Sequence, residues 1–421
     1  MRVLFAVNRE KSIFQYLVPL AWALRTAGHE VCVAGQPSFA KVITQAGLTA
    51  VPLGDDRDPW RITENRQDRL DALRVGIMAP YDAFDDPAKA TWEYLKPGML
   101  KATQGWHRVS NFPIIKELVD FARHWQPDLV IWAPLSYAGP IAAKACGAAH
   151  ARLLFGVDVY GGVRRLYRRL NEQQPPEDRA DPLADWLASY GRKYGFDFSE
   201  DMLTGNFTID QFPLSLQIEA EGLHYLRMQY VPYGGPAVVP DWLRTPPRRP
   251  RVGLTMGLDA TEVYNGYDVD VQVILDALAD LDIELVATVA ESEQRKLARV
   301  PGNARLVSYV PWQAMVPTCS AVIHHAGAAT LATTALHPVP HLSLHYHYDQ
   351  PILARKLAEH GAGLEIHTSQ ATGQAVRDSL LRLLNEPAFR ERAHDLRDEI
   401  HALPTPNQLV PQLEELTARH H

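Results

Sequence analysis

Two adjacent histidines followed by a run of small residues form the clearest candidate binding site in the sequence. Residues 322–336 read VIHHAGAATLATTAL, and a second polar stretch, HYHYDQ, occupies residues 345–350. The first stretch predicts a buried strand, a tight turn and a helix, and the second marks the end of a further strand. Such a turn brings backbone N–H groups and the positive end of a helix dipole to one point, which is how proteins hold a pyrophosphate without a metal. We expect the anion at Gly327, Ala328, Ala329 and Thr330.

Side chains on both sides of this turn would complete a ligand site. His325 adds a donor that can be cationic beside a pyrophosphate, and Thr330 offers a hydroxyl at the start of the helix. Asp349 and Gln350 follow the next strand, at the edge of an open α/β sheet where ligands bind. A carboxylate next to an amide presents acceptors and donors together, which suits sugar hydroxyls. The competing interpretation is a tightly packed turn with two satisfied histidines.

Alternating strands and helices position these residues, and they occur in two series. Strands are expected at residues 2–7, 31–34, 50–53, 128–132 and 151–155, with helices at 17–24, 39–46, 114–125 and 138–146. The alternation begins again with strands at 251–255, 284–288 and 305–307 and helices at about 269–279, 291–298 and 373–403. Continuous apolar strands are typical of parallel sheets covered on both faces. The pattern predicts an α/β protein with two doubly wound, Rossmann-like domains facing one cleft.

A proline-rich segment separates the two series. Residues 232–250, PYGGPAVVPDWLRTPPRRP, contain six prolines and a glycine pair, as a hinge linker would. We therefore predict domains at residues 1–231 and 251–421, and the last helices either complete the second domain or pack back on the first. Residues 54–110 interrupt the alternation with Asp, Arg, Trp, Tyr and Pro, which is typical of a variable insertion over a binding cleft.

Composition limits the function further. The 421 residues, 46% of them hydrophobic, suffice for two sizeable cores, and a net charge of −7 argues against nucleic acid or an anionic membrane as the main partner. The three cysteines, Cys32, Cys146 and Cys319, lie in apolar runs and are expected to be free thiols in a reducing compartment. No apolar run approaches the roughly 18 residues that span a bilayer, so we expect a cytoplasmic protein. His345 and His347 alone do not complete a metal site.

Several segments together resemble a known family. VPWQAMVPTCSAVIHHAGAATLATTAL and the following DQ pair are similar to the donor-site signature of family 1 glycosyltransferases, which have the two-domain GT-B fold. LVPLAWALRTAGHEV, QAGLTAVPLG, PDLVIW, AAKACGAAHARLL and VPYGGPAVVPDWL resemble the bacterial enzymes that attach dTDP-deoxysugars to polyketide antibiotics such as macrolides and anthracyclines. The match covers nearly the whole chain and is weakest in residues 54–110. It implies an inverting transferase with the acceptor in the N-terminal domain and a dTDP-sugar as donor substrate in the C-terminal domain, with no cofactor and no metal.

The resemblance also implies roles for individual residues. Val310 and Trp312 would lie beside the thymine base, and Gly257 would approach the nucleotide. The diphosphate would be held by residues of the histidine turn, namely His325, Gly327, Ala328, Ala329 and Thr330. Asp349 and Gln350 would contact the sugar. The family usually has glycine at positions 326 and 329, where this chain has alanine, and alanine suits the helical part of the turn but not a positive φ.

The base that should activate the acceptor is missing. In the relatives a histidine precedes the LVPLAWAL helix, and Ile13 occupies that position here. Either another carboxylate acts as base, with Asp158 and Glu10 as candidates, or the alignment of this loop is shifted. A third explanation is a phenolic or activated aromatic-carbon acceptor that needs no strong base. A fourth is a protein that binds the donor without catalysis.

Partners and rival functions follow from the same resemblance. Some of the resembled enzymes work with a cytochrome-P450-like auxiliary protein, whose contact surface would lie in residues 54–110 and 160–200. The other expected partners are the dTDP-deoxysugar, a polyketide or aromatic acceptor and a second copy of the chain in a homodimer. The rival functions are a catalytically impaired dTDP-sugar-binding homologue and a GT-B sugar-nucleotide epimerase.

Overall fold

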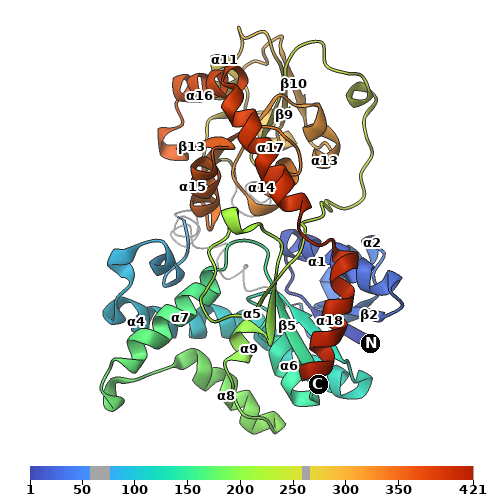
Figure 1. Ribbon diagram of the computed structural model, residues 1–421, viewed down its shortest axis with the longest axis vertical. Coiled ribbons are helices and arrows are strands. Elements are labelled where there is room, and N and C mark those ends of the chain that lie inside the picture. Colours follow the sequence, from blue (N-terminus) through green and yellow to red (C-terminus); the bar gives the residue numbers. More distant parts are fainter. Residues whose placement is uncertain (57–75, 258–265, 421) are drawn as a thin grey trace.

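Two separate parallel β-sheets, each flanked by helices, make up the protein (Figure 1). A computed structural model describes residues 1–56, 76–257 and 266–420. In this part of the chain the first sheet has seven strands in the order β3-β2-β1-β4-β5-β6-β7, and the second has six in the order β10-β9-β8-β11-β12-β13. Both sheets reverse their winding direction once, between β1 and β4 and between β8 and β11. These topologies confirm the two doubly wound α/β domains predicted from the sequence.

The first sheet consists of β1 (Arg2–Ala6), β2 (Glu30–Gly35), β3 (Ala50–Pro52), β4 (Leu129–Trp132), β5 (Ala149–Leu153), β6 (Phe207–Asp210) and β7 (Tyr225–Arg227). Its helices are α1 (Lys11–Thr26), α2 (Ala40–Gln45), α4 (Trp92–Ala102), α5 (Arg108–Trp125), α6 (Ala138–Cys146), α7 (Val159–Glu172), α8 (Pro182–Tyr194) and α9 (Asp201–Thr204). Short helical turns at Tyr81–Phe84 and Pro87–Lys89, with a π-helical turn at Thr103–His107, lie in the described part of the predicted insertion. Residues 57–75 of that insertion lie outside the described residues.

The second sheet consists of β8 (Arg251–Thr255), β9 (Glu284–Thr288), β10 (Ala304–Val307), β11 (Ala321–His324), β12 (His341–His345) and β13 (Gly363–His367). Its helices are α11 (Val271–Ala277), α12 (Glu291–Gln294), α13 (Trp312–Met315), α14 (Ala328–Ala335), α15 (Gln350–His360), α16 (Gly373–Asn385) and α17 (Pro387–His401). All four residues of β11, AVIH, are buried, as expected for a central parallel strand covered on both faces.

The chain passes between the two domains more than once. The linker at 232–250 is extended apart from a turn at Asp241–Arg244, where Trp242 packs against the guanidinium groups of Arg251 and Arg305. After α17 the chain returns, and α18 (Pro406–His420) lies beside α1 of the N-terminal domain (Figure 1). Leu413 of α18 is fully buried in the same apolar cluster as Phe5 of β1.

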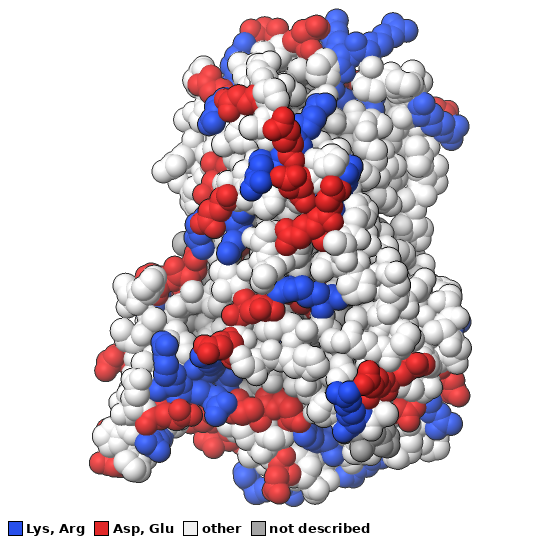
Figure 2. All heavy atoms as spheres, viewed as in Figure 1, with Lys and Arg blue, Asp and Glu red and all other residues white. Residues whose placement is uncertain are grey.

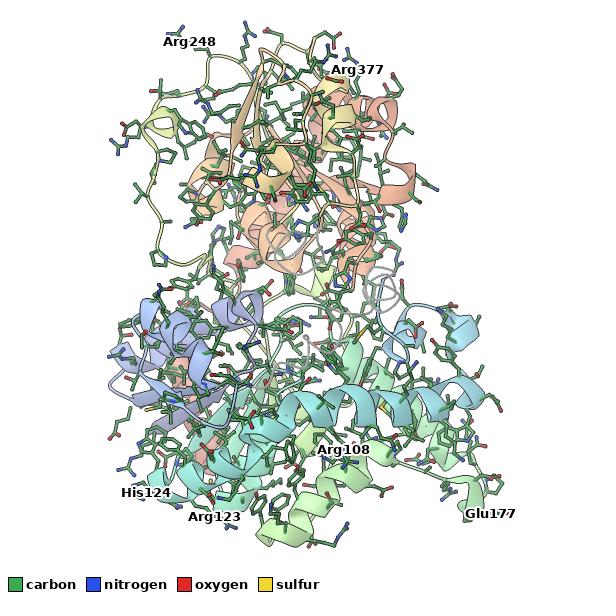
Figure 3. All side chains as sticks on the ribbon, turned by 180° about the vertical axis from the view of Figure 1, so that it is seen from behind. Arg108, Arg123, His124, Glu177, Arg248 and Arg377 are labelled. Carbon is green, nitrogen blue, oxygen red and sulfur yellow. The ribbon has the colours of Figure 1, made fainter. Side chains whose placement is uncertain are left out.

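The surface carries mixed charge. Lys and Arg are interspersed with Asp and Glu over the face shown in Figure 2. Arg248 and Arg377 lie at the outer end of the C-terminal domain, whereas Arg108, Arg123 and His124 lie on the N-terminal domain (Figure 3). No helix among the described residues is long and apolar enough to cross a membrane. The three cysteines are free thiols, and burial raises the pKa of Cys319 to about 12.

Candidate active site

The winding reversal of the second sheet brings together three residues of the predicted donor site. Beyond β8 the chain reaches Gly257, and directly after the neighbouring strand β11 it reaches His325. A Cβ on Gly257 would lie 2.7 Å from His325 Cε1, and one on Gly327 would lie 2.1 Å from His325 Nε2. The imidazole therefore rests against two residues that have no side chain. This is the edge of the sheet at which doubly wound folds bind ligands.

Helix α14 begins at the same place, and no side chain among the residues that the structure describes caps its first backbone N–H groups. Gly327 is the N-cap residue, with φ −59° and ψ 133°, and the first turn contains no acidic residue. Ala328, Ala329 and Thr330 are only partly buried. Since the first N–H groups of a helix have no partner within the helix, this terminus can bind an anion. The residues expected to hold the diphosphate thus lie together.

Ala326 adopts the conformation that sequence reasoning considered unsuitable for alanine. It is fully buried with φ +59°, in the left-handed region that favours glycine. Its N–H donates a hydrogen bond of 2.9 Å to Nδ1 of His324. Ala329, in contrast, lies within the helix, where alanine is suited. The turn therefore keeps the shape expected of glycine although position 326 carries a Cβ.

Burial disfavours the cationic form of His325, so the predicted cationic donor depends on a neighbouring pyrophosphate. Burial lowers the pKa of His325 to about 4; the nearby His347 lowers this pKa further, whereas the backbone of Thr255 acts in the opposite direction. A neutral imidazole still offers one N–H donor. Positive charge would develop there only if a bound anion compensates for burial.

Asp349 contacts the opposite domain. It is buried, and its Oδ2 accepts a hydrogen bond of 3.0 Å from the N–H of Val157, in the loop between β5 and α7. A Cβ on Gly156 would lie 2.0 Å from the same oxygen. Burial raises the pKa of Asp349 to about 7, although the bond from Val157 lowers it. The carboxyl predicted to contact the sugar therefore also joins the two domains.

Gln350 supports the turn before α15. Its Oε1 accepts hydrogen bonds from the N–H groups of Tyr346 (3.4 Å) and His347 (3.2 Å). Gly76 of the N-terminal domain donates its N–H to the carbonyl of Tyr346 at 2.9 Å and accepts from Tyr348 at 3.1 Å. The DQ segment is thus held from both sides, and its contact with the sugar stays a prediction.

Trp312 and Val310, expected beside the base, are anchored in the C-terminal domain. The indole N–H of Trp312 donates to Oγ1 of Thr334 in α14 at 3.0 Å, and its ring lies 3.2 Å from where a Cβ on Gly253 would be. Val310 is buried with Leu243. Val310 can therefore present its backbone to a nucleotide, and Trp312 can present its partly exposed indole ring.

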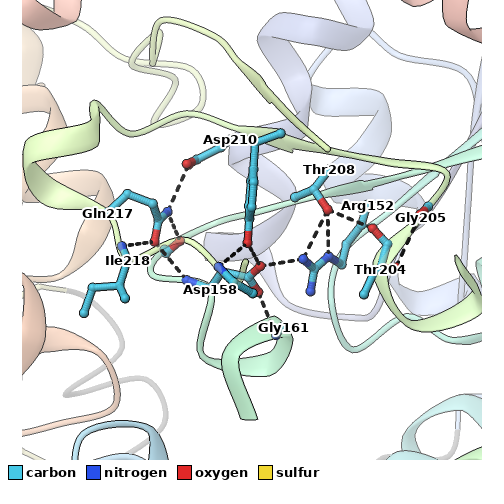
Figure 4. A network of polar contacts seen from close by, with 12 residues as sticks. Arg152, Asp158, Gly161, Thr204, Gly205, Thr208, Asp210, Gln217 and Ile218 are labelled. Carbon is cyan, nitrogen blue, oxygen red and sulfur yellow. Dashed lines mark hydrogen bonds and ion pairs between the residues drawn. The ribbon is translucent and has the colours of Figure 1, made fainter. Parts of the chain in front are cut away.

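The two candidate bases have different surroundings. Asp158 is fully buried. Its carboxylate accepts from Arg152 (2.5 Å) and from the N–H of Gly161 (2.9 Å), as Figure 4 shows, and also from the hydroxyl of Tyr225 (2.7 Å). This side chain caps α7 and neutralises a buried guanidinium, so we correct its assignment as a candidate base. Glu10, at the start of α1, is only partly buried.

Glu10 acts electrostatically on Tyr160 of the N-terminal domain, which lies near Tyr348 of the C-terminal domain. Burial chiefly raises the pKa of Tyr160, with Glu10 and Asp349 among the smaller causes. The ring of Tyr160 lies 6.4 Å from that of Tyr348, which stacks on Phe155 with centroids 6.1 Å apart. Ile13 is half-buried on α1, close in sequence to Glu10.

Sequence reasoning missed the residues that face Asp349. It selected Asp158 as a candidate base, whereas the neighbouring residues Gly156, Val157 and Tyr160 approach Asp349 and Tyr348 of the C-terminal domain. Gly156 was a usable signal for this contact, because a glycine within an otherwise apolar segment often marks the close approach of another chain segment. His345 pairs with Glu365 at 2.9 Å, and the described residues contain no group of three or more His, Cys, Asp or Glu arranged to hold a metal ion.

Comparison with known proteins places this geometry in a family. Residues 22–257 match the family described as "Erythromycin biosynthesis protein CIII-like, N-terminal domain", and residues 272–416 match its C-terminal domain. The chain belongs to the erythromycin biosynthesis protein CIII-like family. It is 46% identical to 10-deoxymethynolide desosaminyltransferase from Streptomyces venezuelae, over 100% of this chain and 98% of that protein. It is 42% identical to aclacinomycin-T 2-deoxy-L-fucose transferase from Streptomyces galilaeus, over 100% and 97%.

Solved structures of glycosyltransferases have the same fold as this family member. The structure of glycosyltransferase VinC in complex with dTDP is similar with a TM-score of 0.88 and 38% identity, and the match covers 100% of both chains. Spinosyn forosaminyltransferase SpnP is similar with a TM-score of 0.83 and 38% identity, over 99% of both chains. These findings confirm the predicted GT-B fold and the resemblance to antibiotic glycosyltransferases. The chain is a glycosyltransferase.

Proposed function

We propose that this glycosyltransferase moves a deoxysugar from a dTDP-sugar to a polyketide-type acceptor, with inversion at the anomeric carbon. The observation that carries the proposal is the turn in which His325 rests against Gly257 and Gly327 at the uncapped start of α14. Full-length similarity to transferases named for desosamine and 2-deoxy-L-fucose, and to VinC bound to dTDP, supports the donor class.

In the proposed reaction the bond from the anomeric carbon to the diphosphate oxygen breaks while a bond from the acceptor forms on the opposite face. The departing diphosphate receives hydrogen bonds from the N–H groups of Ala328, Ala329 and Thr330 and from His325. Such donors act most strongly where charge develops in the transition state. With these groups stabilising the leaving group, we propose that the transfer needs no metal or further cofactor.

The acceptor loses a proton, and we propose Glu10 as the group that takes it. Glu10 follows β1 at the winding reversal of the first sheet, where its charge reaches Tyr160, and Asp158 is occupied by Arg152. General base catalysis typically contributes about 10²–10⁴-fold. An acidic phenol or an activated aromatic carbon would need less of this help.

Calorimetry with dTDP and a transfer assay with dTDP-deoxysugars and macrolide or anthracycline aglycones test the function together. We expect dTDP binding, a glycosylated product of inverted configuration by NMR, and the same rate in the presence of a chelator. Binding of dTDP without transfer to any acceptor would instead indicate a donor-binding homologue. Conversion of the dTDP-sugar without acceptor would indicate an epimerase.

The substitution Glu10→Gln tests the base. We expect kcat to fall about 10²-fold or more with dTDP affinity unchanged. The control Glu177→Gln removes a carboxylate at the outer end of the N-terminal domain (Figure 3) and should leave kcat unchanged. Equal activity of Glu10→Gln and wild type on both aliphatic-hydroxyl and phenolic acceptors would rule out Glu10.

A cytochrome-P450-like auxiliary protein and a homodimer stay predictions. The surface proposed for the auxiliary protein lies in residues 54–110 and 160–200, whose described part includes α4, α8 and most of α7. Activity that appears only on mixing with a co-purified protein supports this partner. Full activity of the isolated chain removes it.

A further inference from the structure

A pair of buried histidines adjoins the histidine turn at residues 325–330, outside the set of predicted site residues. His324 ends β11 and His341 begins the neighbouring strand β12, and both side chains are fully buried. Their rings meet edge to face, with centroids 5.1 Å apart, and Nε2 of His324 lies 2.9 Å from Nδ1 of His341. His324 also accepts the N–H of Ala326 at 2.9 Å. The pair therefore connects the core of the sheet to the turn.

The directions of these hydrogen bonds follow from the backbone. An amide N–H can only donate, so Nδ1 of His324 is the acceptor and its proton is on Nε2. Nε2–H then donates to Nδ1 of His341, and the proton of His341 is on its Nε2. That nitrogen has no hydrogen-bond partner among the described residues. Burial lowers the pKa of both imidazoles, that of His341 to about 3, so both rings stay neutral around pH 7.

The residue that this pair holds is the strained one. Ala326 has φ +59°, a conformation that is unfavourable for a residue with a Cβ. It stands between His325 and Gly327, and so it sets the directions of the imidazole and of the first N–H groups of α14. A side chain that accepts the N–H two residues later closes a turn of the kind that Asn and Asp commonly form. His324 provides this acceptor from a ring fixed by His341.

We propose that His324, held by His341, is a positioning residue for the donor diphosphate, because it keeps Ala326 in the left-handed conformation that aims His325 and the start of α14 at the ligand. The inference rests on the proposed function, since it assumes that this turn binds the diphosphate. It assigns no contact between His324 and the donor.

Two polar substitutions of His324 separate the acceptor role from simple core filling. In His324→Asn, the side-chain oxygen lies near the position of Nδ1 and can accept the N–H of Ala326. In His324→Gln, the oxygen lies near the position of Nε2 and cannot. By calorimetry with dTDP, we expect the Asn variant to bind within about threefold of wild type and the Gln variant about tenfold more weakly, with kcat reduced in the Gln variant.

The substitution Ala326→Gly provides a second measurement that does not depend on the stability of the Gln variant. Glycine adopts the positive φ without strain, so in Ala326→Gly the turn no longer needs the acceptor of His324, and the dTDP affinity of this variant is the reference for the double variant. When glycine occupies position 326, adding His324→Gln should weaken dTDP binding only about threefold relative to Ala326→Gly alone. Thermal unfolding of each variant verifies that the protein compared is folded.

The outcomes distinguish this inference from the function on which it rests. Equal dTDP affinity of folded His324→Asn and His324→Gln would overturn the positioning role, and so would an equal loss with Ala and with Gly at position 326. Wild-type protein that does not bind dTDP would overturn the proposed function itself.

Discussion

The contact between Gly156 and Asp349 makes one substitution especially informative. Replacing Gly156 by alanine would place a Cβ 2.0 Å from Asp349 Oδ2 and 3.2 Å from its Cγ. The φ angle of Gly156 lies outside the left-handed region, so the backbone itself accepts alanine. The nearest other atom, the Cβ of Ala328, would be at an ordinary contact distance of 3.8 Å. Alanine therefore acts on Asp349 alone.

The size of the effect follows from this geometry. Non-bonded heavy atoms prefer separations of about 3.5–4 Å, so the carboxylate must move by about 1.5 Å. This movement breaks the 3.0 Å hydrogen bond from Val157. A buried N–H left without an acceptor costs about 1–3 kcal/mol. We expect the thermal midpoint of Gly156→Ala to fall by a few degrees. We also expect kcat/KM to fall about tenfold to 10²-fold, because the displaced Asp349 leaves the position in which we predict that it contacts the sugar.

Thermal unfolding and steady-state transfer kinetics measure both quantities. The control Gly302→Ala adds a Cβ with no atom within 4 Å and should resemble wild type. In the double variant Gly156→Ala, Asp349→Ala the colliding oxygen is absent, so Gly156→Ala should have little further effect on either quantity. The reasoning is refuted if Gly156→Ala matches wild type, or if the losses of the two single variants simply add.

Three further predictions concern other parts of the molecule. The pKa of Asp349 is raised by burial to about 7, above its unfolded value near 3.8, so its contribution to stability is complete below about pH 4 and is lost as the pH rises through 7. When the free energy of unfolding is measured with denaturant from pH 4 to pH 8, Asp349→Asn should lose up to about 4 kcal/mol less than wild type. A pH dependence should remain in this variant because Asp210 has a similar pKa. Asp158→Asn leaves the buried guanidinium of Arg152 without its counter-ion and should destabilise the protein by about 3–5 kcal/mol, while kcat per folded molecule stays near wild type; a loss of kcat in stable protein would contradict the structural role. Leu413→Ala in α18 should cost about 2–5 kcal/mol and lower the midpoint of the N-terminal domain, as followed by urea unfolding; an unchanged midpoint would show that α18 contributes little.

Much of the fold could be predicted because short, continuous sequence patterns identify its strands. The strand expected at residues 284–288 is observed as Glu284–Thr288, since a continuous apolar run in a parallel sheet has few alternative placements. The helix expected at 114–125 begins six residues earlier, at Arg108, because Pro113 lies inside the observed helix instead of limiting it. Local signals thus identified the elements better than their ends.

The strand, turn and helix within residues 322–336 were predictable because one continuous segment carries them. The neutral state of His325 and the left-handed Ala326 were not, since burial and backbone conformation arise from the surrounding chain. The contact of Asp349 with Val157 joins residues 192 positions apart, and only the complete fold brings them together. Asp158 was predicted as a candidate base, and its ion pair with Arg152 and its cap of α7 appear only in the folded structure.

The return of α18 to the N-terminal domain has a consequence for the order in which the protein is made. Leu409, Leu413 and Leu416 fill the same apolar cluster as Val3 and Phe5, yet the whole second sheet separates these segments in the chain. On the ribosome the first sheet therefore emerges with this part of its core uncovered. This part stays uncovered until residues 406–420 have been synthesised. The N-terminal domain begins to fold first and is completed last.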